Sequence, residues 1–264
     1  MTATASGSIV KVAVEDRVAI VTIDRPPVNA LGRQTMQELQ QAFDGIRGDA
    51  TVKVVILTGA GSLAFVAGAD VKEIAALSSG KEAAEVAALG QRVINGIQRL
   101  NKPVIAAING VCLGGGNELA MACHLRVAGD RVRFGQPEIN LGIIPGFGGT
   151  QRLPRIIGRA KATELILTGD MITAQEAYRL GWLNYVVPQD QVMKTAKDLA
   201  RKIAAKSRRA IELCLDAIEY GLEHSLDDGL AREAQAFGQV AETEDFKEGL
   251  GAFLQKRQPQ FKDR

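Results

Sequence analysis

The sequence predicts an α/β core, with a sheet covered by helices on both faces, followed by a helical region. Two apolar runs, VKVVILTG (52–59) and KPVIAAING (102–110), are continuous rather than alternating, which is typical of strands that are buried on both faces. A helical pattern separates them, so the connection between these strands crosses over the sheet. From about Asp190 onward the apolar residues have helical spacing and no strand pattern remains.

The elements of the core follow in order along the chain. Residues 9–26 form two β-branched runs around a polar turn at 15–17, which predicts a hairpin closed by two prolines. Residues 33–48 predict a helix, and strand 52–59, helix 81–100 and strand 102–110 continue the alternation. The apolar residues of the first helix lie at helical spacing: Met36, Leu39, Phe43 and Ile46.

We expect two regions, an active-site core over residues 1–188 and a C-terminal helical oligomerisation region over 189–264. The helices of the second region carry many apolar residues without a sheet of their own to cover. They either fold back on the core or pack on another subunit, and we favour a subunit contact. The apolar positions are Ile211, Leu215, Ile218, Leu222, Leu226, Leu230, Phe237, Phe246, Leu250 and Phe253.

Composition excludes several classes of partner. The 264 residues include 32 Lys and Arg and 30 Asp and Glu, a formal net charge of +2, so no global basic field would recruit nucleic acid. Three cysteines without a C-x-x-C pair favour a reducing cytoplasm. The N-terminal MTATASGSIV has no targeting pattern and no apolar run is long enough to span a membrane, so we expect a cytoplasmic protein without a membrane partner. With two histidines, a metal cluster or a Ser-His triad is poorly supplied.

The stretch LGGGNELA (113–120) places three glycines directly before Asn117 and Glu118. In one interpretation Asn117 caps a helix and Glu118 complements the helix dipole in the first turn. In the other, Glu118 is a buried carboxylate that takes part in chemistry, because the flanking segments are apolar on both sides.

A second acid, Glu138, lies among apolar residues in FGQPEINLGIIPGFGGTQRL, again close to glycines. Two carboxylates beside glycine-rich turns suit acid/base chemistry in which one takes a proton and the other gives one. Two unrelated surface acids are the alternative.

The glycine-rich segments 114–116 and 65–70 (FVAGAD) could each present backbone N–H groups to an oxyanion or a phosphate, or could simply make tight turns. GAGSLA (59–64) imitates a dinucleotide-binding turn, but no helix can follow it cleanly, so this signal is weak. The sequence contains neither a P-loop nor a G-x-S-x-G motif.

The chain resembles the enoyl-CoA hydratase (crotonase) family, part of the enoyl-CoA hydratase/isomerase superfamily. Six stretches carry the resemblance in the family's order: RPPVNAL, FVAGADVKE, KPVIAAINGVCLGGGNELAMACHLRVA, FGQPEINLGIIPGFGGTQRLPRIIG, LTGDMITAQEAYRLGWLNYVV and AFLQKR. The resemblance implies a crotonase-like spiral of β-β-α units with a C-terminal helical trimerisation region, usually assembled as a hexamer, a dimer of trimers.

The resemblance also implies a reaction, the addition of water to a trans-2-enoyl-CoA to give a 3-hydroxyacyl-CoA in fatty-acid or related degradation. No separate cofactor is expected, because coenzyme A is part of the substrate. An isomerase or thioester hydrolase of the same fold, and a non-catalytic acyl-CoA-binding oligomer, are the alternatives. A dinucleotide-dependent oxidoreductase is a poorer one.

Roles for individual residues follow from the same resemblance. The backbone N–H groups of Ala67 and Gly115 would form an oxyanion hole for the thioester carbonyl. Glu118 would activate the water, Glu138 would deliver the proton to C2, and Gly146 would donate to that water.

The resemblance further assigns residues to coenzyme A. They lie in three places: Arg25 and Val28 in RPPVNAL, Ala69, Asp70 and Lys72 in GADVKE, and Phe253 and Lys256 in AFLQKR, the last pair from a neighbouring subunit. RPPVNAL is one residue shorter than the RP-x-x-x-NAL form of many short-chain hydratases, a difference in the loop that holds the ligand.

Overall fold

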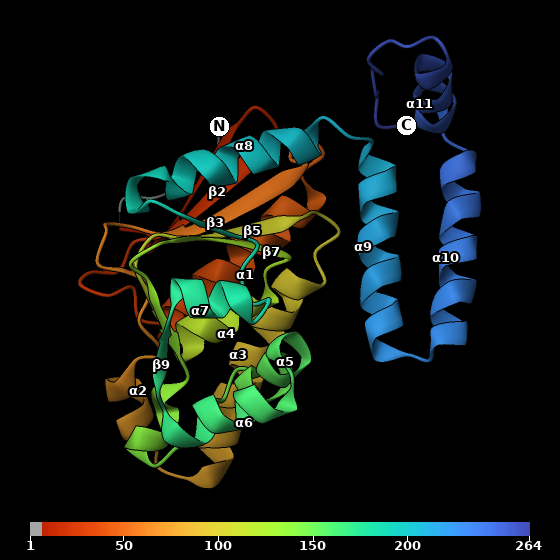
Figure 1. Cartoon of the computed structure of the whole chain (residues 1–264). Coiled ribbons are helices and arrows are strands. Elements are labelled where there is room, and N and C mark those ends of the chain that lie inside the picture. The colour runs from red at the N-terminus through yellow and green to blue at the C-terminus, as the bar shows by residue number, and fades with distance from the viewer. Residues whose placement is uncertain (1–6) are drawn as a thin grey trace.

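Two sheets form the core of residues 7–264, the part of the chain that a computed structural model describes (Figure 1). The first six residues of the N-terminal segment that lacks a targeting pattern lie outside the described residues. Among residues 7–264, the larger sheet has six strands in the order β1-β2-β3-β5-β7-β10, parallel except for the β1–β2 hairpin. Its strands are β1 (Val10–Glu15), β2 (Val18–Ile23), β3 (Val54–Gly59), β5 (Val104–Ile108), β7 (Leu125–Gly129) and β10 (Tyr185–Val187).

The smaller sheet has four strands within the described residues, in the order β4-β6-β8-β9. They are β4 (Ala64–Val66), β6 (Val111–Leu113), β8 (Arg133–Gly135) and β9 (Met171–Thr173). β4, β6 and β8 run parallel and follow β3, β5 and β7 along the chain, so that each turn of the chain adds one strand to each sheet. This repeat confirms the predicted spiral of β-β-α units. Strands of three residues are too short to show a period in the sequence, which is why they were not predicted individually.

Helices connect the successive turns of the spiral. They are α1 (Arg33–Gly48), α2 (Val71–Ala75), α3 (Gly80–Gln98), α4 (Gly115–Ala122), η1 (Pro137–Leu141), α5 (Gly149–Ile157), α6 (Arg159–Thr168), α7 (Ala174–Arg179) and η2 (Gln189–Gln191). α1 has the bounds that the sequence predicted, and it buries Met36, Leu39 and Phe43 in the main core. None of the helices that the structure describes is both long enough and apolar enough to cross a membrane.

Helix α8 (Val192–Ala204) covers the outer face of the larger sheet (Figure 1). Its small residues Ala196 and Ala200 pack on Ile56 of β3 and Ile105 of β5 in a second core cluster. With α1 and α3 on the other face, β3 and β5 are buried on both sides, which explains their continuous apolar sequences. α8 falls in the predicted region 189–264 but packs on the core, so the helices that project from the core begin at Arg208.

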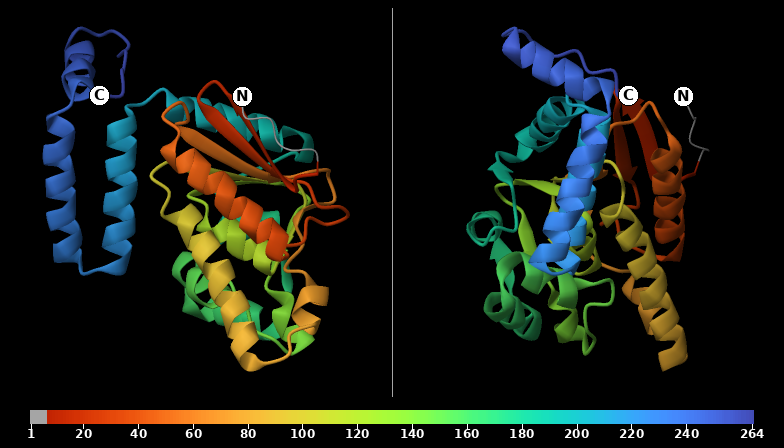
Figure 2. Two further views of the ribbon diagram at one scale, coloured as in Figure 1. Left: turned by 180° about the vertical axis from the view of Figure 1, so that it is seen from behind. Right: turned by 90° about the vertical axis from the view of Figure 1, so that its right-hand side faces the viewer.

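Helices α9 (Arg208–Glu223) and α10 (Leu226–Ala241) form an antiparallel hairpin that stands beside the core, with α11 (Glu244–Leu254) at its end (Figure 2). Large apolar side chains on this hairpin and on α11 are exposed: Ile218, Leu222, Leu226, Leu230, Phe237, Leu250, Phe253 and Leu254. The core of the same chain thus leaves these eight side chains uncovered.

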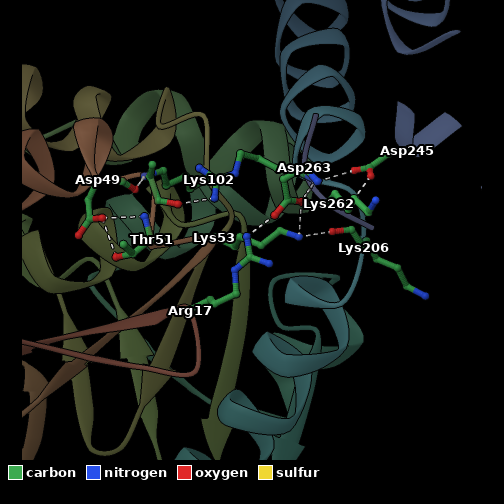
Figure 3. A network of polar contacts seen from close by, with 11 residues as sticks. Arg17, Asp49, Thr51, Lys53, Lys102, Lys206, Asp245, Lys262 and Asp263 are labelled. Atoms are coloured by element: carbon green, nitrogen blue, oxygen red, sulfur yellow. Dashed lines mark hydrogen bonds and ion pairs between the residues drawn. The ribbon is translucent and has the colours of Figure 1, made fainter. Parts of the chain in front are cut away.

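A polar network fastens the C-terminal tail to the core (Figure 3). The ammonium group of Lys53, whose side chain is 1% exposed, lies 2.7 Å from Asp263 Oδ1, and Arg17 pairs with the other oxygen of the same carboxylate. Burial alone would raise the pKa of Asp263, but hydrogen bonds from Lys53 and Arg17 lower it to about 2. Asp245 in α11 accepts from the backbone N–H groups of Lys262 and Asp263 at 2.7 and 3.0 Å. Asp263 Oδ1 also accepts from the backbone N–H of Arg208 at 2.9 Å, so the tail links α11 to the start of α9.

Candidate active site

The candidate site lies at the carboxyl ends of the parallel strands of the smaller sheet. The AGAD turn follows β4, the glycine run follows β6, and Gln136 and Glu138 follow β8. Because parallel strands end at the same edge of a sheet, three segments far apart in the sequence meet there.

At each position of the run 114–116, a different close contact explains why the residue is glycine. Gly114 has a φ of 50°, and a Cβ placed on it would lie 2.8 Å from Glu138 Oε1. A Cβ on Gly115 would lie 3.3 Å from the backbone nitrogen of Ala69 and 3.2 Å from the ring of Phe147. On Gly116 it would lie 2.1 Å from the carbonyl oxygen of Val66. The glycines therefore bring the start of α4 against the AGAD turn.

The backbone N–H groups at this junction correct one sequence-based prediction, the choice of Ala67 as an oxyanion donor. The N–H of Ala67 donates to the carbonyl oxygen of Val28 at 3.1 Å, so it cannot serve as the predicted oxyanion donor. The N–H of Ala69, two residues on, makes no hydrogen bond within residues 7–264, and neither does that of Gly115. Ala69 and Gly115 are thus the pair of available donors that approach one another.

Glu118 lies in the first turn of α4 and is 1% exposed. Its Oε1 accepts from the backbone N–H groups of Phe147 and Gly149 at 2.8 and 2.6 Å, and no hydrogen bond within the described residues uses Oε2. Burial raises the pKa of Glu118 to about 7, with a further rise from Glu138, against the two backbone hydrogen bonds and Arg152, which lower it. One oxygen is therefore anchored, and the other is free to exchange a proton near neutral pH.

The structure combines features of both interpretations of Glu118 and corrects one detail. Asn117 does not cap the helix, because α4 already begins at Gly115 with Gly114 at the N-cap position. The Asn117 side chain is fully buried, and its amide donates to the carbonyl oxygen of Gly135 at 3.4 Å. Glu118 is in the first turn, as an acid that complements the helix dipole would be, and it is also buried.

Glu138 is half-buried in η1, and burial raises its pKa as well. The sequence offered no signal for its neighbour Gln136, which is fully buried. In the amide orientation that satisfies its surroundings, Gln136 donates to both carboxylate oxygens of Glu138 and to the carbonyl oxygen of Gly114, each at 3.2 Å. Gln136 thus ties Glu138 to the glycine run.

An apolar pocket opens beside these groups. Its lining comes from α1, α2, α3, the segments next to α1 and α2, and the turn before α5: Leu31, Gly32, Arg33, Met36, Ala69, Asp70, Glu73, Ile74, Leu77, Val86, Leu89, Gly90 and Phe147. The Phe147 ring closes against α3, where a Cβ on Gly90 would lie 2.2 Å from Phe147 Cδ1. The pocket suits a short apolar chain with one polar end.

The predicted residues for coenzyme A fall into two groups. Asp70 lines the pocket. Arg25 pairs with it at 2.6 Å, and Asp70 also caps α2 by accepting from Lys72 N, so Arg25 and Lys72 lie next to the pocket lining. Val28 accepts from the N–H of Ala67 in the AGAD turn through its carbonyl oxygen.

Phe253 and Lys256 lie in or after α11, at the opposite end of the protomer from α2 (Figure 1). One protomer therefore does not bring them to the pocket, and their contribution from a neighbouring subunit remains a prediction.

Several functional groups were missed from the sequence. The N–H groups of Phe147 and Gly149 anchor Glu118, and the PGFGG run that contains them was a usable signal, since a glycine-rich turn exposes backbone donors. Arg33 supplies a positive charge at the pocket. The N–H of Gly146 makes no protein hydrogen bond among residues 7–264, and its role toward a water molecule remains a prediction. In the same residues, no three His, Cys, Asp or Glu side chains converge with metal-binding geometry.

The chain is similar to known proteins along nearly its whole length. A family model described as enoyl-CoA hydratase/isomerase matches residues 13–264. The chain is 46% identical to a short-chain-enoyl-CoA hydratase of Clostridium acetobutylicum, over 95% of this chain and 96% of that protein. It is 45% identical to a crotonyl-CoA hydratase of Syntrophomonas wolfei, over 94% and 95%. The crystal structure of an enoyl-CoA hydratase from Bacillus anthracis superposes with a TM-score of 0.93 at 41% identity, covering 97% of this chain and 100% of that one.

Proposed function

The chain belongs to the enoyl-CoA hydratase/isomerase family, and on that premise we propose that it is an enoyl-CoA hydratase. As such it is a hydro-lyase, which adds water across the double bond of a trans-2-enoyl-CoA to give the 3-hydroxyacyl-CoA. The observation that carries the proposal is the pair of carboxyl groups of Glu118 and Glu138, both with raised pKa values, beside the free N–H groups of Ala69 and Gly115.

The N–H groups of Ala69 and Gly115 bind the thioester carbonyl oxygen of the substrate. Addition at C3 converts this carbonyl into an enolate, so negative charge grows on the oxygen and the two hydrogen bonds strengthen in the transition state. Because both donors belong to backbone held by packed turns, they need no reorganisation during the reaction.

Glu118 takes the proton from the attacking water with its free oxygen, Oε2, while Oε1 stays bound to Phe147 and Gly149. The hydroxide forms the bond to C3, the enolate collapses, and C2 takes a proton from Glu138. Glu118 ends protonated and Glu138 ionised, and a proton exchange through solvent restores both. The product gains the elements of one water: the oxygen and one hydrogen come from the attacking water, and the hydrogen at C2 comes from Glu138.

The direct test is to mix the purified protein with crotonyl-CoA and follow the loss of the conjugated thioester absorbance. We expect rapid loss, with mass spectrometry showing the gain of one water, as 3-hydroxybutyryl-CoA. An unchanged mass would indicate an isomerase, and release of free coenzyme A would indicate a thioester hydrolase. Either of these outcomes, or binding without any turnover, would overturn the proposal.

The pH dependence of kcat/KM follows from Glu118. The proton acceptor must be ionised and its pKa is raised to about 7, so kcat/KM should fall about tenfold per pH unit below that value. Initial rates with crotonyl-CoA from about pH 5 to pH 9 at constant ionic strength would measure this limb. A profile that stays flat down to pH 5 would exclude Glu118 as the base.

We also propose that the chain works as a homo-oligomer, a dimer of trimers built through α9 to α11. Support comes from the exposed apolar side chains of these helices, with Leu222 at 75% and Phe253 at 79% exposure. In such an assembly Phe253 and Lys256 of one subunit would reach the coenzyme A of another.

Sedimentation velocity should therefore give the mass of six chains. A Leu222→Lys, Phe237→Lys variant should sediment as smaller species, whereas Leu63→Lys, at an exposed leucine of the core, should not change the mass. A wild-type monomer would contradict the proposed assembly.

Two further proposals concern chemistry and location. The reaction needs no cofactor beyond the coenzyme A of the substrate, because the proposed steps use only carboxyl and backbone N–H groups. Activity that survives dialysis against a chelator would support this proposal.

All three cysteines are free thiols, which supports a reducing, cytoplasmic location.

A further inference from the structure

Arg152 in α5 binds the turn that anchors Glu118, through the carbonyl oxygen of Phe147. Arg152 Nη1 donates to the carbonyl oxygen of Phe147 at 3.1 Å. That carbonyl belongs to the chain between the two N–H groups that bind Glu118 Oε1. Arg152 Nε and Nη2 donate to Gln98 and Asn95 of α3 at 2.8 and 2.5 Å. One guanidinium thus locks the turn 146–149 to α3.

The contacts continue from α3 to the projecting helical hairpin. The side-chain nitrogen of Gln98 donates to Glu219 in α9. Next to it, Arg99 pairs with Glu223, one turn further along α9, at 3.1 Å. A continuous series of hydrogen bonds therefore runs from Glu118 through the turn, Arg152 and Gln98 to Glu219, on a helix of the hairpin that stands beside the core (Figure 2).

The positively charged side chain of Arg152 forms no salt bridge with a carboxylate among the described residues. Burial lowers its pKa, while Glu118 from α4 and Glu219 from α9 raise it; Arg99 and Cys123 are the other groups that act on it. The groups that face Glu118 are Glu138 and Arg152. A guanidinium remains protonated in such surroundings, so it favours the ionised form of Glu118.

We propose that Arg152 is a positioning residue for the hydration reaction, which holds the turn 146–149 beneath Glu118 and links that turn, through Gln98 and Glu219, to helix α9. The proposal rests on the proposed function and deepens it. Because α9 is one of the helices with exposed apolar side chains, the geometry around Glu118 depends on the position of the α9–α10 hairpin relative to the core.

The first test compares Arg152→Gln with Arg152→Lys. Arg152→Gln removes the charge and the contacts, so we expect kcat with crotonyl-CoA to fall about 10- to 100-fold with a smaller change in KM. The acid limb of the pH profile should also move to higher pH, because the carboxylate loses a nearby positive charge. Arg152→Lys keeps the charge but not the fork of donors, so kcat should fall while the limb stays in place.

Arg155→Gln is the matched control, because Arg155 is exposed on the same helix and donates only within it, to Gln151. It should leave kcat and the acid limb unchanged. An unshifted limb in Arg152→Gln, or an equal shift in Arg155→Gln, would overturn the positioning role.

The link to α9 is tested by a double-mutant cycle. Glu219→Ala should lower kcat in the same direction but by less, whereas Glu223→Ala, which loses only the exposed pair with Arg99, should not. If the series is continuous, adding Glu219→Ala to Arg152→Gln should cost little more than Arg152→Gln alone. Fully additive effects would show that α9 and the turn are independent.

Hydrogen–deuterium exchange gives a readout that does not depend on turnover. Exchange in the peptide that contains residues 146–149 should be faster in Arg152→Gln and in Glu219→Ala than in their two controls. Equal exchange in all four would overturn the proposal, whatever the wild type catalyses. Failure of the wild-type chain to hydrate crotonyl-CoA would instead reject the proposed function. If Arg152→Gln does not fold, Arg152→Lys and Glu219→Ala decide the question.

Discussion

Replacing Glu118 with Gln is expected to remove most of the hydration rate and, at the same time, to make the folded chain more stable. The glutamine keeps an oxygen for the N–H groups of Phe147 and Gly149, so the site should retain its shape. It cannot take a proton from water, and kcat should fall on the order of 1,000-fold while KM changes little. Steady-state kinetics with crotonyl-CoA would measure both values.

The gain in stability follows from the sign of the pKa change. The pKa of Glu118 rises from 4.5 to about 7 on folding, so the folded chain binds this proton more tightly than the unfolded chain. The free energy of unfolding therefore decreases as pH rises through that interval, and the full penalty, about 3 kcal/mol, is present above it. Glutamine does not ionise and escapes the penalty.

Thermal denaturation of the wild type and of Glu118→Gln would reveal this difference. The variant should have the higher Tm above pH 7, and the two values should converge below pH 4.5. Glu85→Gln, at an exposed position of α3, is the matched control and should show neither effect. A variant that keeps the wild-type rate would exclude Glu118 from catalysis. An equal or lower Tm at high pH would contradict the burial argument.

Substituting Ala for Gly115 is expected to lower kcat about 100- to 1,000-fold while the fold persists. The new Cβ would lie 3.3 Å from the nitrogen of Ala69, between the two proposed donors, where the thioester oxygen should bind. Its other close neighbour is the Phe147 ring at 3.2 Å, a side chain that can shift by a few tenths of an ångström. The loss should therefore be kinetic rather than structural.

Two further glycines make this prediction specific. Gly116→Ala should destabilise the fold instead, because its Cβ would lie 2.1 Å from the backbone oxygen of Val66, which cannot move aside. Gly45→Ala, in open space on α1, should be neutral or slightly stabilising. If Gly115→Ala loses Tm like Gly116→Ala and keeps its rate per folded molecule, the oxyanion hole is misplaced.

Much of the larger sheet was predictable because its strands are long and buried on both faces. The runs around Val54 and Val104, and the helix at 33–48, appear where their periodicity indicated. The smaller sheet was not predictable as a set of strands, since each of its strands has three residues and depends on neighbours from other turns of the spiral.

In the site, the sequence predicted the functional side chain better than the functional backbone groups. Glu118 stood out because a carboxylate in an apolar stretch needs a reason, and the structure buries it as expected. The choice between Ala67 and Ala69 could not be made from sequence, because both residues have the same side chain. Only the structure shows that the N–H of Ala67 is bonded to Val28.

The position of the functional groups at the ends of β4, β6 and β8 has a consequence for how this scaffold can change. Each turn of the spiral delivers some of the functional groups: a donor after β4, a donor and an acid after β6, and a second acid after β8. Replacing the segment after β8 alone would remove Glu138 while both donors stay in place. New reactions of enolate intermediates could thus arise by changing one short loop at a time, which makes residues 136–141 the first place to vary in directed evolution.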